Sequence, residues 1–169
     1  NGVGKRAAES YLHTLARNSR VATVTLRYFN VFGPGHDPSS HYAAVIPLLI
    51  TAVLEDRSPT VNGDGAETRE VTYIDNVVAA NVLAASASSA VTGMTMNIAC
   101  GGRISLLDLL EAIGTAASKV VKPVFGPPRE GDIQHSMADV SLAQDAIGYS
   151  VVTPFDEGIS ETVDWYRRA

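Results

Sequence analysis

The stretch VATVTLRYFNVFG, residues 21–33, decides the fold class. It begins with β-branched residues and continues as a nearly unbroken apolar run, which is typical of a strand buried on both faces of a parallel sheet. A Gly-Pro-Gly turn at 33–35 ends it. A helical pattern precedes the run over residues 5–17, and a buried helix follows over 42–56. This alternation of helix and strand predicts an α/β fold.

Residues 58–75 read as a β-hairpin, because two β-branched segments flank a Gly-Asp-Gly turn at 63–65. Asp75 is then a plausible N-cap for an alanine-rich helix over 76–88. Ser105 is expected to cap the next helix in the same way, with Asp108 completing a weak capping box. Two short strands and two closing helices are predicted at 95–99 and 121–125 and at 141–147 and 154–167.

Composition and charge exclude several classes of function. The formal net charge of −5 argues against nucleic acid or an anionic membrane as the main partner. The single cysteine excludes an internal disulfide and is compatible with a reducing compartment. The apolar runs are shorter than the roughly 20 residues of a membrane span, and the four histidines are not spaced as a metal site. We therefore expect a cytoplasmic protein without a bound metal.

The first residues, NGVGKRAAESYLHTLA, already lie inside an amphipathic helix. A glycine-rich dinucleotide-binding turn between a strand and a helix is missing from the sequence, and the Gly101-Gly102 pair lacks the third glycine in register. These two observations predict that the chain begins partway through a larger nucleotide-binding fold.

Four blocks in order carry a family resemblance: RYFNVFGPGHDP at 27–38, YAAVIP at 42–47, NGDGAETREVTYIDNVVAAN at 62–81 and PREGDIQHSMAD at 128–139. Together they resemble the C-terminal half of the NAD-dependent epimerase/dehydratase family, the extended short-chain dehydrogenases. The first three blocks look most like UDP-sugar 4-epimerases.

The resemblance implies the C-terminal part of an NAD(P)-binding Rossmann fold joined to the smaller substrate-binding domain. We expect residues 1–169 to form one compact unit. The Rossmann remnant would cover about 1–35 and the nucleotide-sugar-binding domain about 36–169.

Family members carry Tyr-x-x-x-Lys at a helix start, and the four-residue spacing puts both side chains on one helical face. By resemblance, Lys5 is the catalytic lysine that holds the nicotinamide ribose, while Asn1 stands where the family has its tyrosine. Spacing alone would equally allow Lys5 to be a solvated helix lysine. The resemblance also places Tyr28 and Phe29 beside the nicotinamide of NAD, although plain core packing would explain them as well.

The other blocks imply a UDP-sugar site. By resemblance, Asn30 contacts the substrate diphosphate, and Arg69 and Arg129 converge on it with bidentate hydrogen bonds. Asp132 would accept hydrogen bonds from the uridine ribose. The residues that match the family's segments beside the nucleotide and the uracil are Ala44, Val45, Val61 and Asn62. Turn formation, surface exposure or simple packing would account for the same residue types.

The implied function is a UDP-glucose or UDP-N-acetylglucosamine 4-epimerase that oxidises the sugar transiently at C4 with NAD. This chain would supply the UDP-sugar-binding half and be inactive alone. A 4,6-dehydratase or decarboxylase of the same family is the alternative enzyme, and a non-catalytic binding or dimerising remnant is the alternative of another class. By resemblance, the helix over 5–17 belongs to a dimer interface, so we expect a homodimer, or association with a missing N-terminal half.

Overall fold

The computed structural model describes residues 2–36, 45–128 and 137–169. Helices and strands alternate along this part of the chain, which confirms the α/β class. The helices are α1 (Gly2–Asn18), α2 (Val45–Leu54), α3 (Ile74–Ser86), the 3-10 turn η1 (Ser89–Val91), α4 (Leu106–Ala117), α5 (Ser141–Ile147) and α6 (Phe155–Arg168). The strands are β1 (Thr25–Tyr28), β2 (Val31–Phe32), β3 (Thr60–Asn62), β4 (Thr68–Arg69), β5 (Thr72–Tyr73), β6 (Thr95–Ile98), β7 (Ile104–Ser105) and β8 (Val124–Gly126).

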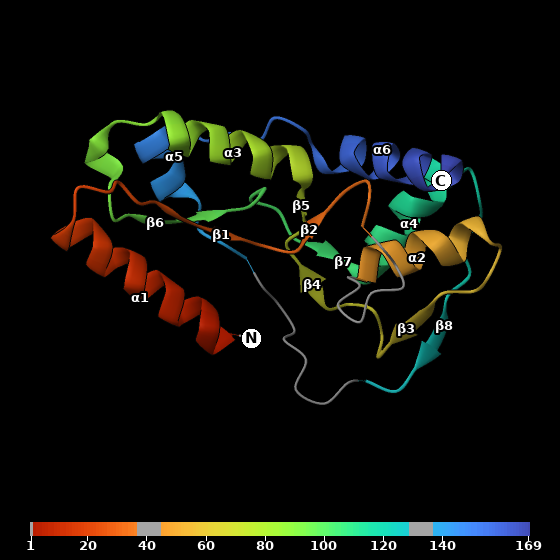
Figure 1. Cartoon of the computed structure of the whole chain (residues 1–169). Coiled ribbons are helices and arrows are strands. Elements are labelled where there is room, and N and C mark those ends of the chain that lie inside the picture. The colour runs from red at the N-terminus through yellow and green to blue at the C-terminus, as the bar shows by residue number, and fades with distance from the viewer. Residues whose placement is uncertain (1, 37–44, 129–136) are drawn as a thin grey trace.

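Strands β1 and β6 pair in parallel, with helices on both sides of the pair (Figure 1). Alternation along β1 points successive side chains to opposite sides. The Arg27 guanidinium reaches Glu9 of α1 on one side, with Nη2 2.6 Å from Oε2. The Tyr28 hydroxyl donates to Oδ1 of Asn81 on α3, 3.1 Å away, on the other. Helix α1 and helix α3 therefore cover different faces of β1.

The chain changes strand partner at Asn30. Strand β1 pairs with β6, whereas β2, directly after Asn30, pairs in parallel with β5. Asn30 has φ of 36°, a left-handed conformation that asparagine tolerates better than most residues. The prediction of one strand over 21–33, buried on both faces, was therefore wrong. The strand is broken at residue 30, and Arg27 and Tyr28 are exposed.

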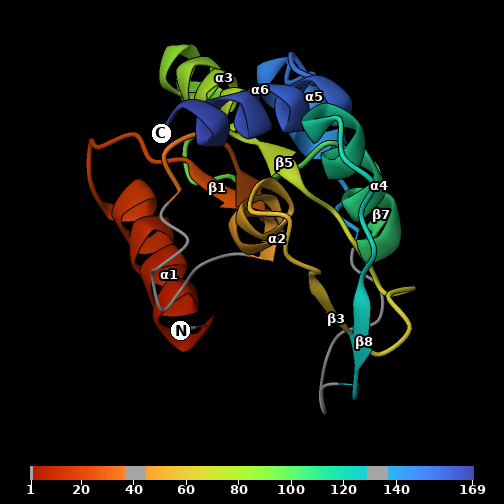
Figure 2. The same ribbon diagram turned by 90° about the vertical axis from the view of Figure 1, so that its right-hand side faces the viewer.

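The predicted hairpin over 58–75 is also wrong. Strand β3 pairs in parallel with β8, and this ribbon extends away from α2 (Figure 2). Strand β4 pairs antiparallel with β7, and β5 pairs with β2. The Gly-Asp-Gly turn thus ends one strand and begins another without pairing them.

The two predicted helix caps have different outcomes. The Ser105 hydroxyl accepts a hydrogen bond from the backbone N–H of Asp108 at 3.0 Å, and the full capping box is present at α4. The N-cap of α3 is Tyr73, so the prediction for Asp75 was wrong. Asp75 lies instead in the first turn of α3, where its negative charge interacts favourably with the positive end of the helix dipole.

Two apolar clusters form the core. One lies among α2, α4 and α6 and contains Ile50, Ile113 and Val163. The other, with Met96 and Ile98 at its centre, packs β6 against α3 and α5. The predicted division of the chain near residue 35 stays a prediction, although the β1–β6 pair joins segments from both sides of it. Among the described residues, none of the helices has the length and apolar character to cross a membrane.

Candidate functional site

A cavity of about 640 Å³ lies where the ends of several elements meet. The junction of β1 and β2, one face of α2, strands β3 and β4, and the start of α4 all contribute to its wall. Its volume is in the range of small-molecule sites. The lining combines an apolar wall, mostly from α2, with polar side chains from the strands, so it can hold a ligand that has both apolar and charged parts.

The cavity brings together four of the residues predicted to bind substrate: Asn30, Val45, Asn62 and Arg69. Val61 lies apart from them, because it is fully buried in the apolar core. Alternation along β3 turns Asn62 toward the cavity and Val61 away from it. The predicted residues Ala44, Arg129 and Asp132 lie outside the described residues, so the proposed convergence of Arg69 and Arg129 stays a prediction.

Arg69 supplies a half-buried guanidinium to this cavity. Its Nη1 donates to the backbone carbonyl of Thr68 at 3.2 Å, and the pairing of Arg69 with Ile104 fixes the backbone of β4. A guanidinium carries five N–H donors in a fixed plane, which suits phosphate and carboxylate oxygens. The Arg69 guanidinium therefore places a group that can bind phosphate or carboxylate oxygens at this end of the cavity.

Asn30 lies at the carboxyl end of β1, where open α/β sheets place their ligands. Its side-chain Nδ2 donates to the backbone carbonyl of Glu70 at 2.6 Å, and the backbone carbonyl of Asn30 accepts from the N–H of Thr72 at 3.2 Å. A side-chain amide has two N–H donors, and the bond to Glu70 uses one of them. Asn30 is thus fixed in place while keeping polar groups at the cavity.

Two charged residues of the cavity wall were not predicted. Arg57 follows α2 and forms an ion pair with Glu55, with Nη2 2.5 Å from Oε2. Glu67 lies in the turn before β4, two residues from Arg69. The G-D-G-x-x-x-R block could have pointed to Glu67 because it spans that position. Only the folded chain brings Arg57 to the cavity.

The predicted cofactor residues are not part of this cavity. Lys5 is exposed on α1, and Phe29 is half-buried after β1. The Tyr28 hydroxyl donates to Asn81 of α3, on the side of β1 opposite α1. The assignments of Lys5 to the nicotinamide ribose and of Tyr28 and Phe29 to the nicotinamide ring stay predictions.

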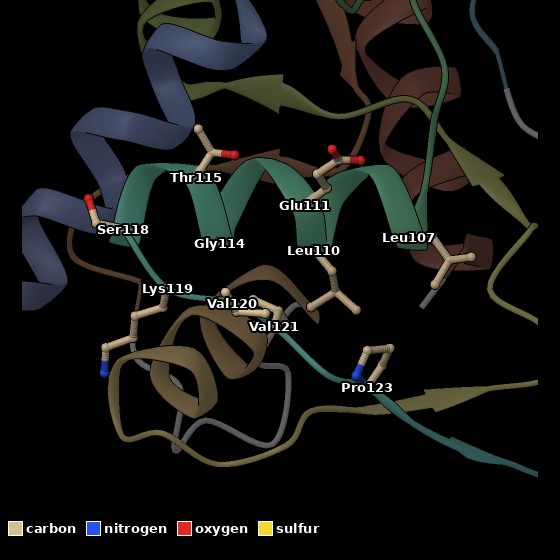
Figure 3. A pocket seen from close by; sticks show the side chains of 10 residues that line it. All are labelled: Leu107, Leu110, Glu111, Gly114, Thr115, Ser118, Lys119, Val120, Val121 and Pro123. Atoms are coloured by element: carbon tan, nitrogen blue, oxygen red, sulfur yellow. The ribbon is translucent and has the colours of Figure 1, made fainter.

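A second cavity, of about 460 Å³, lies between α4 and residues 119–123 (Figure 3). Its wall is mainly apolar, with Leu110 and Val121 prominent. The ammonium of Lys119 turns toward α2, donating to the carbonyl of Leu54 at 2.6 Å and lying 2.8 Å from Oδ1 of Asp56. Fewer polar side chains therefore converge on this cavity than on the cavity that Arg69 lines.

The described residues hold no cluster of three or more histidine, cysteine, aspartate or glutamate side chains that could bind a metal ion. Cys100 is half-buried beside Asn76, with its Sγ 3.5 Å from Nδ2 of that residue. Burial raises the pKa of the Cys100 thiol, so the thiol stays protonated near neutral pH.

The chain belongs to the NAD dependent epimerase/dehydratase family, whose family model matches residues 2–99. The UDP-glucose 4-epimerase of Mycolicibacterium smegmatis is 32% identical over 97% of this chain. This chain covers 51% of that protein. The chain spans about half the length of the curated relatives it matches first.

Solved structures agree with this assignment. The UDP-glucose 4-epimerase of Thermotoga maritima, solved with UDP-glucose, is 30% identical with a TM-score of 0.91 over 99% of this chain and 53% of its own. The UDP-N-acetylglucosamine 4-epimerase of Methanobrevibacter ruminantium, solved with UDP-N-acetylmuramic acid, is 36% identical with a TM-score of 0.88 over 96% of this chain and 51% of its own. Both are Rossmann-fold epimerases, which confirms the predicted fold class.

Members of the family use different chemistry and share a cofactor. A similar curated protein from Bacillus cytotoxicus, 30% identical over 84% of this chain, is a UDP-N-acetyl-α-D-glucosaminuronate decarboxylase. Solved neighbours include proteins in complex with NAD. The family match therefore establishes an NAD-dependent nucleotide-sugar family without fixing a single reaction.

Proposed function

We propose that this chain is the nucleotide-sugar-binding half of a UDP-sugar 4-epimerase of the UDP-glucose or UDP-N-acetylglucosamine type. The observation that carries the proposal is the cavity that gathers Asn30, Asn62 and Arg69 from three separate elements. A diphosphate requires concentrated positive charge and N–H donors, which Arg69 and Asn30 supply.

The two ends of the cavity suit the two ends of a UDP-sugar. The diphosphate would bind Arg69 and Asn30, and Arg129 would add a second guanidinium from the following block. The uracil would lie near Asn62 of β3, with Val45 of α2 beside the nucleotide and Val61 supporting β3 from the core. Ala44 would line the same segment as Val45, and Asp132 would accept the ribose hydroxyls.

NAD would belong to the complete protein. When bound, it supplies the hydride transfer to and from the sugar carbon that is inverted. Lys5 would hold the nicotinamide ribose from α1, and Phe29 and Tyr28 would lie near the nicotinamide. Lys5 is exposed and therefore accessible for this task, and Phe29 follows directly on the strand end that leads to the cavity. By this division of tasks the chain alone binds UDP-sugar and does not catalyse.

A decarboxylase of the same family is the second candidate function, because a similar protein is a decarboxylase. The proposed site would bind the nucleotide and not the reacting carbon, so it would serve either enzyme. A 4,6-dehydratase would use the same half. A decarboxylase would release carbon dioxide from a UDP-uronic acid, and an epimerase would convert UDP-glucose to UDP-galactose with no loss of mass.

The exposed side chains of Val3 and Tyr11 on α1 suit a surface that is covered by another polypeptide. We propose a homodimer or association with an N-terminal half through this helix, in a cytoplasmic protein.

Calorimetry with UDP, UDP-glucose, UDP-N-acetylglucosamine and NAD tests the binding proposal on this chain. We expect UDP and the UDP-sugars to bind and NAD to bind weakly or not at all. Tight NAD binding by this chain alone, or no binding of UDP, would contradict it. In the complete gene product, proton NMR of the sugar should show inversion at C4.

A further inference from the structure

Glu70, the neighbour of Arg69, is a fully buried acidic residue. Burying a carboxylate costs several kcal/mol unless hydrogen bonds or opposite charges compensate it. An apolar residue would fill the same space without that cost. Its presence beside the anion-binding arginine therefore calls for a specific set of partners.

Two backbone amides hold the Glu70 carboxylate. Oε1 accepts from the N–H of Gly101 at 2.5 Å, and Oε2 accepts from the N–H of Ala138 at 2.6 Å. Hydrogen bonds to an ionised group are shorter and stronger than neutral ones. One side chain thus joins two segments that are far apart in sequence.

The main chain of Glu70 makes a third connection. Its carbonyl accepts the 2.6 Å hydrogen bond from Nδ2 of Asn30, which lines the cavity. The left-handed turn at Asn30 is held from the other side by the N–H of Thr72. Glu70 therefore links Asn30, Gly101 and Ala138.

The Gly101 connection also affects Arg69. Gly101 lies three residues before Ile104, and Ile104 is the residue of β7 that pairs with Arg69 of β4. Gly101 has φ of 74°, a conformation natural to glycine, so the loop turns sharply at the point where Glu70 holds it. Holding this loop in place therefore also holds β7, the strand that pairs with the Arg69 backbone.

We propose that Glu70 is a positioning residue of the nucleotide-sugar cavity: its carboxylate holds the loop of Gly101 that leads to the partner strand of Arg69, and so fixes the backbone of residues 69–70, whose Glu70 carbonyl holds the side chain of Asn30, in the geometry that binds a diphosphate. The inference rests on the proposed function for the identity of the ligand. It goes further because it assigns the affinity of the site to a side chain that does not line the cavity.

The test substitutes Glu70→Gln in the complete gene product, since glutamine keeps the shape but turns an NH₂ group toward one of the two N–H donors. The control is Val163→Ala, which removes core packing on α6 and costs stability without touching the loop of Gly101. The dissociation constant of UDP, the KM and kcat for UDP-sugar, and the free energy of unfolding are measured for all proteins.

We expect Glu70→Gln to weaken UDP binding at least tenfold and to raise KM by the same factor, with kcat within twofold of the wild type, because ground-state binding is lost. Val163→Ala should lose stability and keep the wild-type affinity. Equal UDP affinity in Glu70→Gln and wild type, or equal weakening in Val163→Ala, overturns the inference. If Glu70→Gln gives no folded protein, Glu70→Asp, whose shorter side chain cannot span both amides, should weaken UDP binding in the same direction; wild-type affinity would overturn the inference.

A separate readout distinguishes this inference from the proposed function. The ¹⁵N NMR signals of the Asn30 side-chain amide and the Arg69 Nε report the cavity without a ligand. If the wild type does not bind UDP, the proposed function fails. The positioning role then stands if Glu70→Gln shifts both signals and falls if it shifts neither.

Discussion

Gly158 of α6 lies directly against the ring of Tyr73 of β5: a β-carbon at position 158 would come within 2.6 Å of the ring Cγ. Tyr73 is buried, and its hydroxyl donates to Oε2 of Glu161 at 2.5 Å, so the ring cannot move away freely. Glycine at this position lets α6 approach the strand that follows Glu70.

We expect Gly158→Ala to lower the free energy of unfolding by about 1–3 kcal/mol, the usual cost of overpacking. Gly4→Ala on α1 is the matched control, because a β-carbon there meets nothing within 4 Å. Alanine in an exposed helix should raise stability by up to about 1 kcal/mol. Urea unfolding of the two variants measures both changes, and a loss of the same size in each would show that the contact with Tyr73 is unimportant.

Asn30 combines a left-handed backbone with a side-chain hydrogen bond, and two substitutions separate these features. Asn30→Gly accepts the positive φ and loses the side chain, whereas Asn30→Ala also strains the backbone. We expect Asn30→Ala to be less stable than Asn30→Gly by about 1 kcal/mol. Both should weaken UDP binding, as measured by calorimetry. Wild-type affinity in both variants would remove Asn30 from the diphosphate site.

The local features of the fold could be predicted from the sequence, whereas the strand pairing could not. The capping box at Ser105 was readable because both of its members lie within four residues. Thr60 of β3 pairs with Val124, 64 residues further along the chain, and Arg69 of β4 pairs with Ile104, 35 residues further along. A Gly-Asp-Gly turn between β-branched segments favours a hairpin locally, and the remote partners override it.

The site could be predicted only in part, because some of its residues stand in recognisable sequence blocks and others are brought to it only by the fold. Asn30, Asn62 and Arg69 stand in blocks that carry the family resemblance, and the structure brings them to one cavity. Arg57 lies outside those blocks, and its place in the wall depends on how α2 ends. Glu70 stands inside a block, but only the contacts of its carboxylate with Gly101 and Ala138 show what it does.

Tyr149 makes stability depend on pH in the alkaline range. Its hydroxyl donates to the carbonyl of Ala99 at 3.0 Å, and burial raises the pKa of Tyr149 from 10.0 to about 12. Because the pKa is higher in the folded state, this contribution is complete below pH 10.0 and is lost as the pH rises toward 12. We therefore expect the free energy of unfolding to fall between pH 10.0 and about 12, the interval that this shift spans. Tyr149→Phe should show a shallower fall in urea unfolding, and an equally steep fall would assign the effect to other groups.

Arg69 is expected to recognise the phosphates and not the base. Arg69→Gln removes the charge, and a hydrogen bond to a charged group contributes about 1.5–3 kcal/mol, so UDP affinity should fall about 10- to 100-fold. Arg69→Lys keeps the charge without the planar pair of donors and should lose less.

Uridine is the decisive control ligand for Arg69, because it carries the base and ribose without phosphate. Its affinity, measured by the same calorimetry, should be the same in Arg69→Gln and wild type. Arg168→Gln, on α6 with its Nη2 3.8 Å from Asp164, should leave UDP binding unchanged. Equal losses for uridine and UDP in Arg69→Gln would mean that Arg69 supports the whole cavity wall, and unchanged UDP binding would move the diphosphate away from β4.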